Sequence, residues 1–173
     1  MAFINPTPGN AAQQVIVEIN LNSVSGVTSA STAVVLGSGN ITIPAITKLT
    51  INNSKGTYEW AQLDNSAKQV VTTVSTNSLT TDVVIDGETF FGNASLTNAQ
   101  KDGISNMSNN GSQIAFKVRV RNPGAAAQYG TTYGGIGYIT GIAPSVTADQ
   151  PVWQSPLTIA VSGNYIIEAN VAM

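Results

Sequence analysis

The sequence predicts a mainly β fold: a bent antiparallel β-sandwich or half-barrel with one short α-helix, in a single domain covering residues 1–173. Apolar residues recur with a period of two along most of the chain, which is the spacing of strands with one buried face. Turn-forming pairs such as Ser25-Gly26 separate these stretches. Strands divided by turns at such intervals are typical of sandwiches and barrels.

The clearest predicted strand is Gln113–Arg121, in which apolar residues alternate with small or basic ones. Its apolar set is Ile114, Phe116, Val118 and Val120. We expect this set to form the core together with Val83, Ile85, Ile104 and Met107. Further strands are expected over residues 14–21, 82–91, 132–142, 156–162 and 164–171.

The single expected helix covers residues 96–107, where Ala99, Ile104 and Met107 fall near one face behind a cap at Thr97 or Asn98. Gly103 lowers the helix propensity of this segment. We therefore expect a short helix that is stabilised by packing against the sheet.

Residues 52–78 contain two alternating pieces but few large apolar side chains, which predicts an extended loop or hairpin. Trp60 lies in this region, and Trp153 lies between two prolines. Because tryptophan buries a large area, we expect both to be anchors in the core or in an interface, and the core is the preferred interpretation.

Charged residues make up 9% of the chain and hydrophobic residues 42%, whereas an ordinary soluble domain has roughly 25% charged residues. Scattered charge keeps proteins apart in solution. We therefore expect much of the surface to be covered by other copies of the chain. The alternative at this point is an ordinary secreted β-domain.

Several classes of site lack the residues that they need. The net charge of −2 does not provide the basic surface of a nucleic-acid binder. The chain has no cysteine and no histidine, so we expect no metal, no cofactor and no histidine-based catalysis. We also expect no signal peptide and no membrane partner, because no apolar run approaches the roughly 20 residues of a membrane helix.

Two motifs in the sequence have residue types that occur in catalytic or nucleotide-binding sites. Asp82, Asp86 and Glu88 could supply the carboxylate pair of a glycoside hydrolase, but such spacing occurs on many strands. The glycines of residues 133–141 are spaced somewhat like a phosphate loop, yet they lie in a strand pattern that no helix follows. The chain is therefore interpreted as a structural protein and not as an enzyme.

Five segments follow one another in a characteristic order. They are the polar stretch 62–68, the turn and helix at 93–102, the glycine-rich strand 133–142, the bend Ala143-Pro144 and the closing segment 161–165. This order resembles that of the major tail tube proteins of long-tailed phages. The same fold is shared by the tubes of contractile injection machines and of type VI secretion.

The resemblance implies a structural subunit that forms six-membered rings. The sheets of neighbouring subunits would complete a β-barrel lumen on oligomerisation, and stacked rings would conduct double-stranded DNA without binding it specifically. It places the chain in a virion tail that is assembled in the host cytoplasm, with a sheath, tape-measure and tail terminator proteins as further partners. Residues 1–12 are expected to form a flexible or interface-forming arm.

Two sets of residues are candidates for assembly contacts. Tyr58, Trp60, Asp64 and Lys68 are expected in the loop that contacts the next ring. A basic row, Lys117, Arg119 and Arg121, is expected to pair with an acidic row, Asp82, Asp86 and Glu88, within or between subunits. In the simpler interpretation both rows are solvated strand faces.

Two other functions stay open. A phage or cell-surface decoration or adhesion β-domain would share this composition, and a carbohydrate-active enzyme would use the carboxylates.

Overall fold

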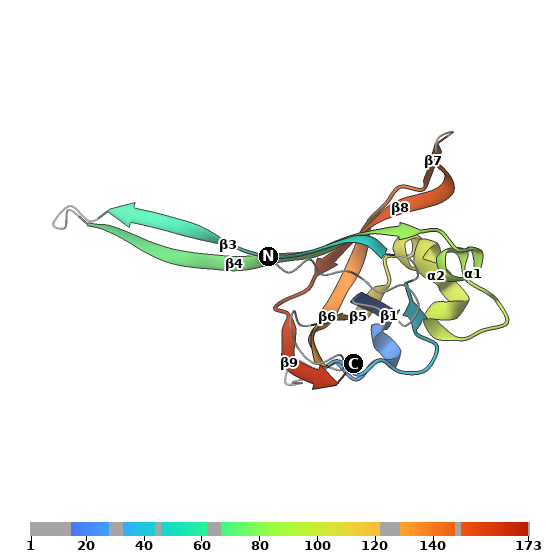
Figure 1. The fold of residues 1–173 in the computed structure, drawn as a ribbon. Coiled ribbons are helices and arrows are strands. Elements are labelled where there is room, and N and C mark those ends of the chain that lie inside the picture. Colours follow the sequence, from blue (N-terminus) through green and yellow to red (C-terminus); the bar gives the residue numbers. More distant parts are fainter. Residues whose placement is uncertain are drawn as a thin grey trace, which may run out of the picture.

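The computed structural model describes residues 15–27, 33–43, 46–61, 67–121, 129–147 and 150–172. Within these ranges the chain forms one nine-stranded antiparallel sheet and two α-helices (Figure 1). The strands are β1 (Val15–Leu21), β2 (Ile41–Thr42), β3 (Ile46–Ala61), β4 (Lys68–Val84), β5 (Gln113–Arg121), β6 (Tyr129–Ile142), β7 (Ser145–Thr147), β8 (Gln150–Val161) and β9 (Ile166–Ala172). The helices are α1 (Gly87–Phe91) and α2 (Asn98–Asn109), and a 3-10 turn, η1, covers Asn22–Val24.

The sheet has the strand order β2-β1-β5-β6-β8-β4-β3, and β6 is its branch point. Residues 137–142 of β6 pair with β8, whereas residues 129–134 pair with β9. β7 pairs with β8. One cluster of buried side chains draws on β1 and β5 on one side of β6 and on β4 and β8 on the other. The sheet is therefore bent around its core, and the mainly β prediction is confirmed.

The core matches the predicted set. Phe116 and Val118 of β5 are fully buried together with Val83 of β4 and with Ile104 and Met107 of α2. Ile114 also belongs to this cluster, and Ile85 and Val120 pack against it half-buried. The period-two pattern of β5 thus identified the buried face correctly.

The helical content differs from the prediction, because a second helix, α1, follows β4. The strand that was expected over residues 82–91 ends at Val84. Asp86 then caps α1: its carboxylate accepts hydrogen bonds from the Thr89 backbone N–H at 3.3 Å and from the Thr89 hydroxyl at 2.6 Å. An N-cap bond of this kind satisfies a backbone donor that the first turn of a helix would otherwise leave free.

The predicted helix is present as α2, and Ala99, Ile104 and Met107 are buried as expected. Thr97 occupies the N-cap position without a side-chain cap bond. Gly103 interrupts the helix with a φ of 70°. A Cβ at Gly103 would collide with the backbone nitrogen of Gly92, which has a φ of 84°. Backbone contact between the two helices therefore requires glycine at both positions.

The β3–β4 hairpin extends far from the body of the subunit (Figure 1). The two strands pair from Ile46 opposite Val83 to Ala61 opposite Lys68. Pairing between β4 and β8 covers residues 77–84 of β4 and ends at Asn77. We call residues 52–61 and 67–77 the hairpin arm. The expectation of an extended loop or hairpin in this region is confirmed as a hairpin.

Candidate functional site

One face of the hairpin arm is aromatic and carries no charge. The register places Tyr58 opposite Val71 and Trp60 opposite Gln69, so these four side chains share a face. The rings of Tyr58 and Trp60 stack with their centroids 6.1 Å apart. Both rings are exposed. We call this set the aromatic face of the arm.

The opposite face of the arm carries charge. Glu59 and Lys68 form an ion pair at 3.1 Å, and Val70 lies opposite Glu59 in the register. Both charged side chains are exposed, so the pair contributes little to stability. The arm is therefore a two-stranded ribbon with one charged face and one uncharged aromatic face.

A β-bulge interrupts the arm near its middle. The register shifts between Lys55 and Thr57. At Gly56 an added Cβ would collide with the Thr73 hydroxyl oxygen, so the strands approach closely there. A bulge increases the local twist of a two-stranded ribbon, so this one changes the orientation of the outer part of the arm relative to its base.

Both tryptophans are exposed, so the expectation that they lie in the core is wrong. Trp60 is 37% exposed and Trp153 is 49% exposed. Trp60 lies on the arm, where within the described residues it stacks on Tyr58 and faces the partner strand. Trp153 lies near the start of β8, where its ring makes an edge-to-face contact with Phe91, with the ring centroids 6.4 Å apart. A role of both tryptophans as interface anchors stays a prediction.

Three of the four residues that were predicted to contact the next ring lie on the hairpin arm. Tyr58, Trp60 and Lys68 lie together on the outer arm, with Lys68 on the charged face. Asp64 lies outside the described residues. The expected arm over residues 1–12 also lies outside them.

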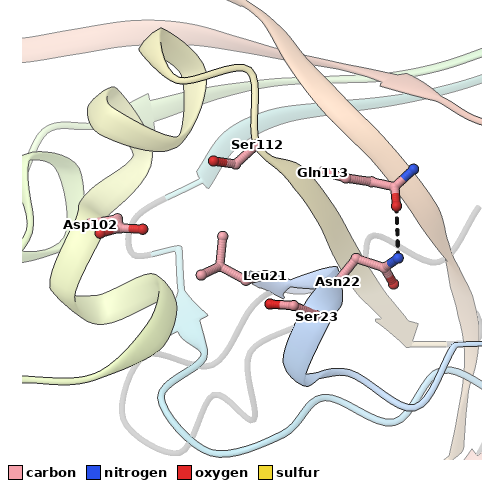
Figure 2. Close-up of a pocket in the computed structure, with 6 residues that line it drawn as sticks. All are labelled: Leu21, Asn22, Ser23, Asp102, Ser112 and Gln113. Carbon is pink, nitrogen blue, oxygen red and sulfur yellow. Dashed lines mark hydrogen bonds between the residues drawn. The ribbon is translucent and has the colours of Figure 1, made fainter.

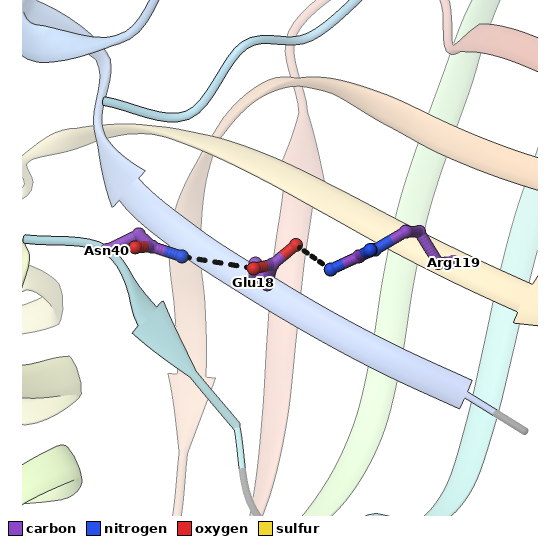
Figure 3. Close-up of polar contacts among 3 residues, drawn as sticks. All are labelled: Glu18, Asn40 and Arg119. Atoms are coloured by element: carbon purple, nitrogen blue, oxygen red, sulfur yellow. Dashed lines mark hydrogen bonds and ion pairs between the residues drawn. The ribbon is translucent and has the colours of Figure 1, made fainter. Parts of the chain in front are cut away.

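Arg119 of the basic row has a partner that the sequence did not indicate. Its Nη2 lies 2.8 Å from Oε2 of Glu18 on the neighbouring strand β1 (Figure 3). Asn40 donates a hydrogen bond to the other carboxylate oxygen of Glu18 at 3.1 Å. The side chains of Arg119 and Glu18 are 26% and 17% exposed. Glu18 therefore balances the charge of Arg119 within the same chain. Because both side chains are mostly buried, solvent screens their attraction only in part.

The acidic residues do not form a row on one strand. Asp82 lies in β4 opposite Lys48, whereas Asp86 and Glu88 belong to the cap and first turn of α1. The hydrogen bonds from the Thr89 hydroxyl and backbone lower the pKa of Asp86 below its ordinary value. That carboxylate is therefore engaged in holding the helix start. Pairing of these acids with another subunit stays a prediction.

An open pocket of about 440 Å³ lies between η1, α2 and β5 (Figure 2). Its lining residues are Leu21, Asn22, Ser23, Asp102, Ser112 and Gln113. The Asn22 side chain donates to the Gln113 side chain at 2.8 Å. The pocket contains a single carboxylate, that of Asp102. Neither Asp82, Asp86 nor Glu88 lines it, so the carboxylates considered for glycoside hydrolysis do not meet there.

Within the described residues, no group of three or more acidic residues could hold a metal ion. No helix in the described part of the chain is both long enough and apolar enough to span a bilayer.

No protein-family model and no curated protein matches the sequence. Solved structures do match it. The tail of an empty gene transfer agent particle, refined with C6 symmetry, matches with a TM-score of 0.61 and 14% identity over 93% of this chain and 100% of that chain. The SPP1 tail tube matches with a TM-score of 0.54 and 16% identity over 93% of this chain and 80% of that one. The chain has the tail tube fold.

A third match comes from a baseplate structure. The baseplate of the anti-feeding prophage, with six-fold symmetry applied, matches with a TM-score of 0.51 and 9% identity over 94% of this chain and 97% of that chain. The resemblance found in the order of the sequence segments is thus confirmed for the fold. The hairpin arm of this chain carries several exposed large hydrophobic side chains: Tyr58 and Trp60 on the aromatic face, and Val70, Val71 and Val74 on β4.

Proposed function

We propose that this chain is the structural subunit of a phage-type tail tube, located in the virion tail. Subunits form hexameric rings, the rings stack into a tube, and the lumen conducts double-stranded DNA during ejection. The observation that carries the proposal is the hairpin arm, which leaves the body with an uncharged aromatic face. The C6 symmetry of the matching gene transfer agent tail supports the ring size.

The arm is suited to a contact with the next ring. An aromatic side chain buries roughly 150–250 Å² when it is covered, and each Å² of apolar area contributes about 25 cal/mol. Covering the exposed parts of Tyr58 and Trp60 would therefore contribute a few kcal/mol per arm before the entropy costs of association. Six arms acting together on one ring would add their contributions through multivalency.

The charge distribution suits a channel that releases its cargo. A bare basic row repeated around a ring would neutralise phosphates and retain DNA. Glu18 compensates Arg119 within the subunit. Glu168 of β9 lies in the same register row, because Arg119 is opposite Thr132 and Thr132 is opposite Glu168. If this face lines the lumen, DNA meets mixed charge and not a basic stripe.

The further partners follow from the same role. Tail terminator and tape-measure proteins would meet the tube at its ends and inside it, and a sheath would surround it in a contractile tail. None of these roles requires a cofactor or a catalytic residue.

Electron microscopy of the purified chain tests the proposal directly, since rings or hollow filaments of uniform width are expected.

The arm is tested by joining Thr57 to Thr72 through an Asn-Gly turn, which suits a two-residue hairpin at these opposed positions. The shortened chain should form rings that do not elongate. Glu59→Gln is the matched control, because it leaves the aromatic face intact. Long tubes from the shortened chain would contradict the role of the arm, and dispersed monomers or trimers from the wild type would favour a decoration domain.

A further inference from the structure

The direction of the hairpin arm is set at its base. Beyond Asn77 the strands of the arm pair with each other, and the β4–β8 pairing has ended. From Asn52 to Ala61 the arm spans about 30 Å at the usual rise of roughly 3.3 Å per residue. A rotation of about 10° at the base would therefore move the tip by about 5 Å, which is larger than the tolerance of a packed contact.

One side chain contacts both strands at this base. The hydroxyl of Tyr165, in the connection between β8 and β9, lies 2.7 Å from the carbonyl oxygen of Ser78 and 3.1 Å from that of Asn52. Ser78 and Asn52 are opposite each other in the register. A phenol has one proton, so the shorter contact to Ser78 is the main bond and the proton is shared with Asn52.

The ring of Tyr165 is fixed to the body of the subunit. It makes edge-to-face contacts with Phe116 on β5 and Tyr133 on β6, with ring centroids 6.2 Å and 6.4 Å apart. The same connection is joined to the arm a second time, because the side chain of Asn77 donates to the carbonyl oxygen of Gly163 at 2.8 Å. The β8–β9 connection therefore links the core to the point where the arm leaves it.

We propose that Tyr165 is a positioning residue that holds the arm at the angle required to reach the next ring. This inference rests on the proposed function for its purpose, but the restraint itself is a property of the isolated subunit. Burial raises the pKa of Tyr165 to about 12, so the hydroxyl keeps its proton at neutral pH and can act as the donor.

The test removes one hydroxyl. Tyr165→Phe keeps the ring and its packing. Tyr133→Phe is the matched control, since its ring lies in the same aromatic cluster and, among the described residues, its hydroxyl makes no hydrogen bond to the arm. The chain has no cysteine, so spin labels can be placed at Glu59→Cys on the arm and Asn109→Cys on α2. Electron–electron double resonance then measures the distance distribution between arm and body.

We expect Tyr165→Phe to broaden this distribution and to slow tube elongation by about fivefold or more, the factor that one hydrogen bond contributes to an equilibrium. Ring formation should be unchanged, and Tyr133→Phe should change neither measurement. Equal distributions for the two variants would overturn the positioning role. If the wild type forms no tubes but the distribution still broadens, the proposed function fails while the restraint stands.

Discussion

The Arg119 guanidinium lies 2.8 Å from the Glu18 carboxylate, and the two residues are 101 positions apart in the chain. They lie diagonally across β1 and β5, since Glu18 is opposite Lys117 and Arg119 is opposite Ile16. The Nε atom of Arg119 is buried and has no hydrogen-bond partner among the described residues. The guanidinium therefore depends on Glu18 for its compensation.

Removal of the carboxylate charge should destabilise the subunit. Glu18→Gln is expected to lower the free energy of unfolding by about 1–3 kcal/mol, because it leaves a half-buried guanidinium without a counter-charge. Urea denaturation measures this loss. Glu59→Gln, in the exposed pair on the arm, should cost under about 0.5 kcal/mol. A double-mutant cycle of Glu18→Gln with Arg119→Met that shows no coupling would contradict the pairing.

The core prediction concerns β5. Phe116→Ala should lower the free energy of unfolding by about 3–5 kcal/mol, since Phe116 is fully buried and its loss leaves a cavity. Val74→Ala on the arm, where the side chain is 88% exposed, is the control and should change stability by less than about 0.5 kcal/mol. A loss below about 1 kcal/mol for Phe116→Ala would mean that the face of β5 is assigned incorrectly.

Gly103 tests the contact between the two helices. Gly103→Ala combines a positive φ with a collision against the α1 end, so we expect a loss of at least about 2 kcal/mol. Gly111→Ala has a similar φ of 61° but open space around its Cβ, so it should cost only about 1 kcal/mol. The difference between the two, measured by thermal or urea unfolding, isolates the collision. Equal losses would show that the helices can separate at no cost.

Alkaline pH should weaken the base of the arm. The pKa of Tyr165 is raised from 10.0 to about 12 in the folded chain. The folded state therefore retains the proton where the unfolded state has lost it, so the associated stability is complete below about pH 10 and falls as the pH rises from 10 towards 12. Unfolding measured over this range should show a smaller decline in Tyr165→Phe than in the wild type. Identical pH profiles would contradict this assignment.

The aromatic face of the arm should matter for assembly and not for folding. Trp60→Ala is expected to change the free energy of unfolding by less than about 1 kcal/mol, because its ring contact within the described residues is with Tyr58 of the arm and not with the core. It should nevertheless reduce tube elongation as seen by electron microscopy. Val70→Ala on the charged face is the control and should elongate normally. Normal tubes from Trp60→Ala would remove the aromatic face from the stacking contact.

Particular residues show what the sequence could predict. The bounds of β5 were correct because its alternation is uninterrupted and Ile114, Phe116 and Val118 on one face are fully buried. α1 was missed because Thr89 and Phe91 continue the alternation of the preceding strand, although the N-cap signal of Asp86 with Thr89 three residues later was present. The alternating pattern favours a strand there, whereas the N-cap residue Asp86 favours a helix, and the structure has the helix.

Other features depend on partners far apart in the chain. The Glu18–Arg119 pair requires the register between β1 and β5, which no local pattern specifies. The exposure of Trp60 and Trp153 could not be distinguished from burial, because a large apolar side chain suits a core and an interface equally well. The hairpin was predictable, since residues 52–78 offered too few apolar side chains to pack against a core.

The continuity of β4 from arm to body has a mechanical consequence. Register pairs between β4 and β8 run from Asn77 opposite Val161 to Val84 opposite Gln154. A tensile load along the arm would act parallel to these strands, so it would strain their hydrogen bonds together in shear. A sideways load would instead open them one at a time from Asn77. The junction between the arm and the body should therefore resist a pull along the arm more strongly than a sideways bend of the arm.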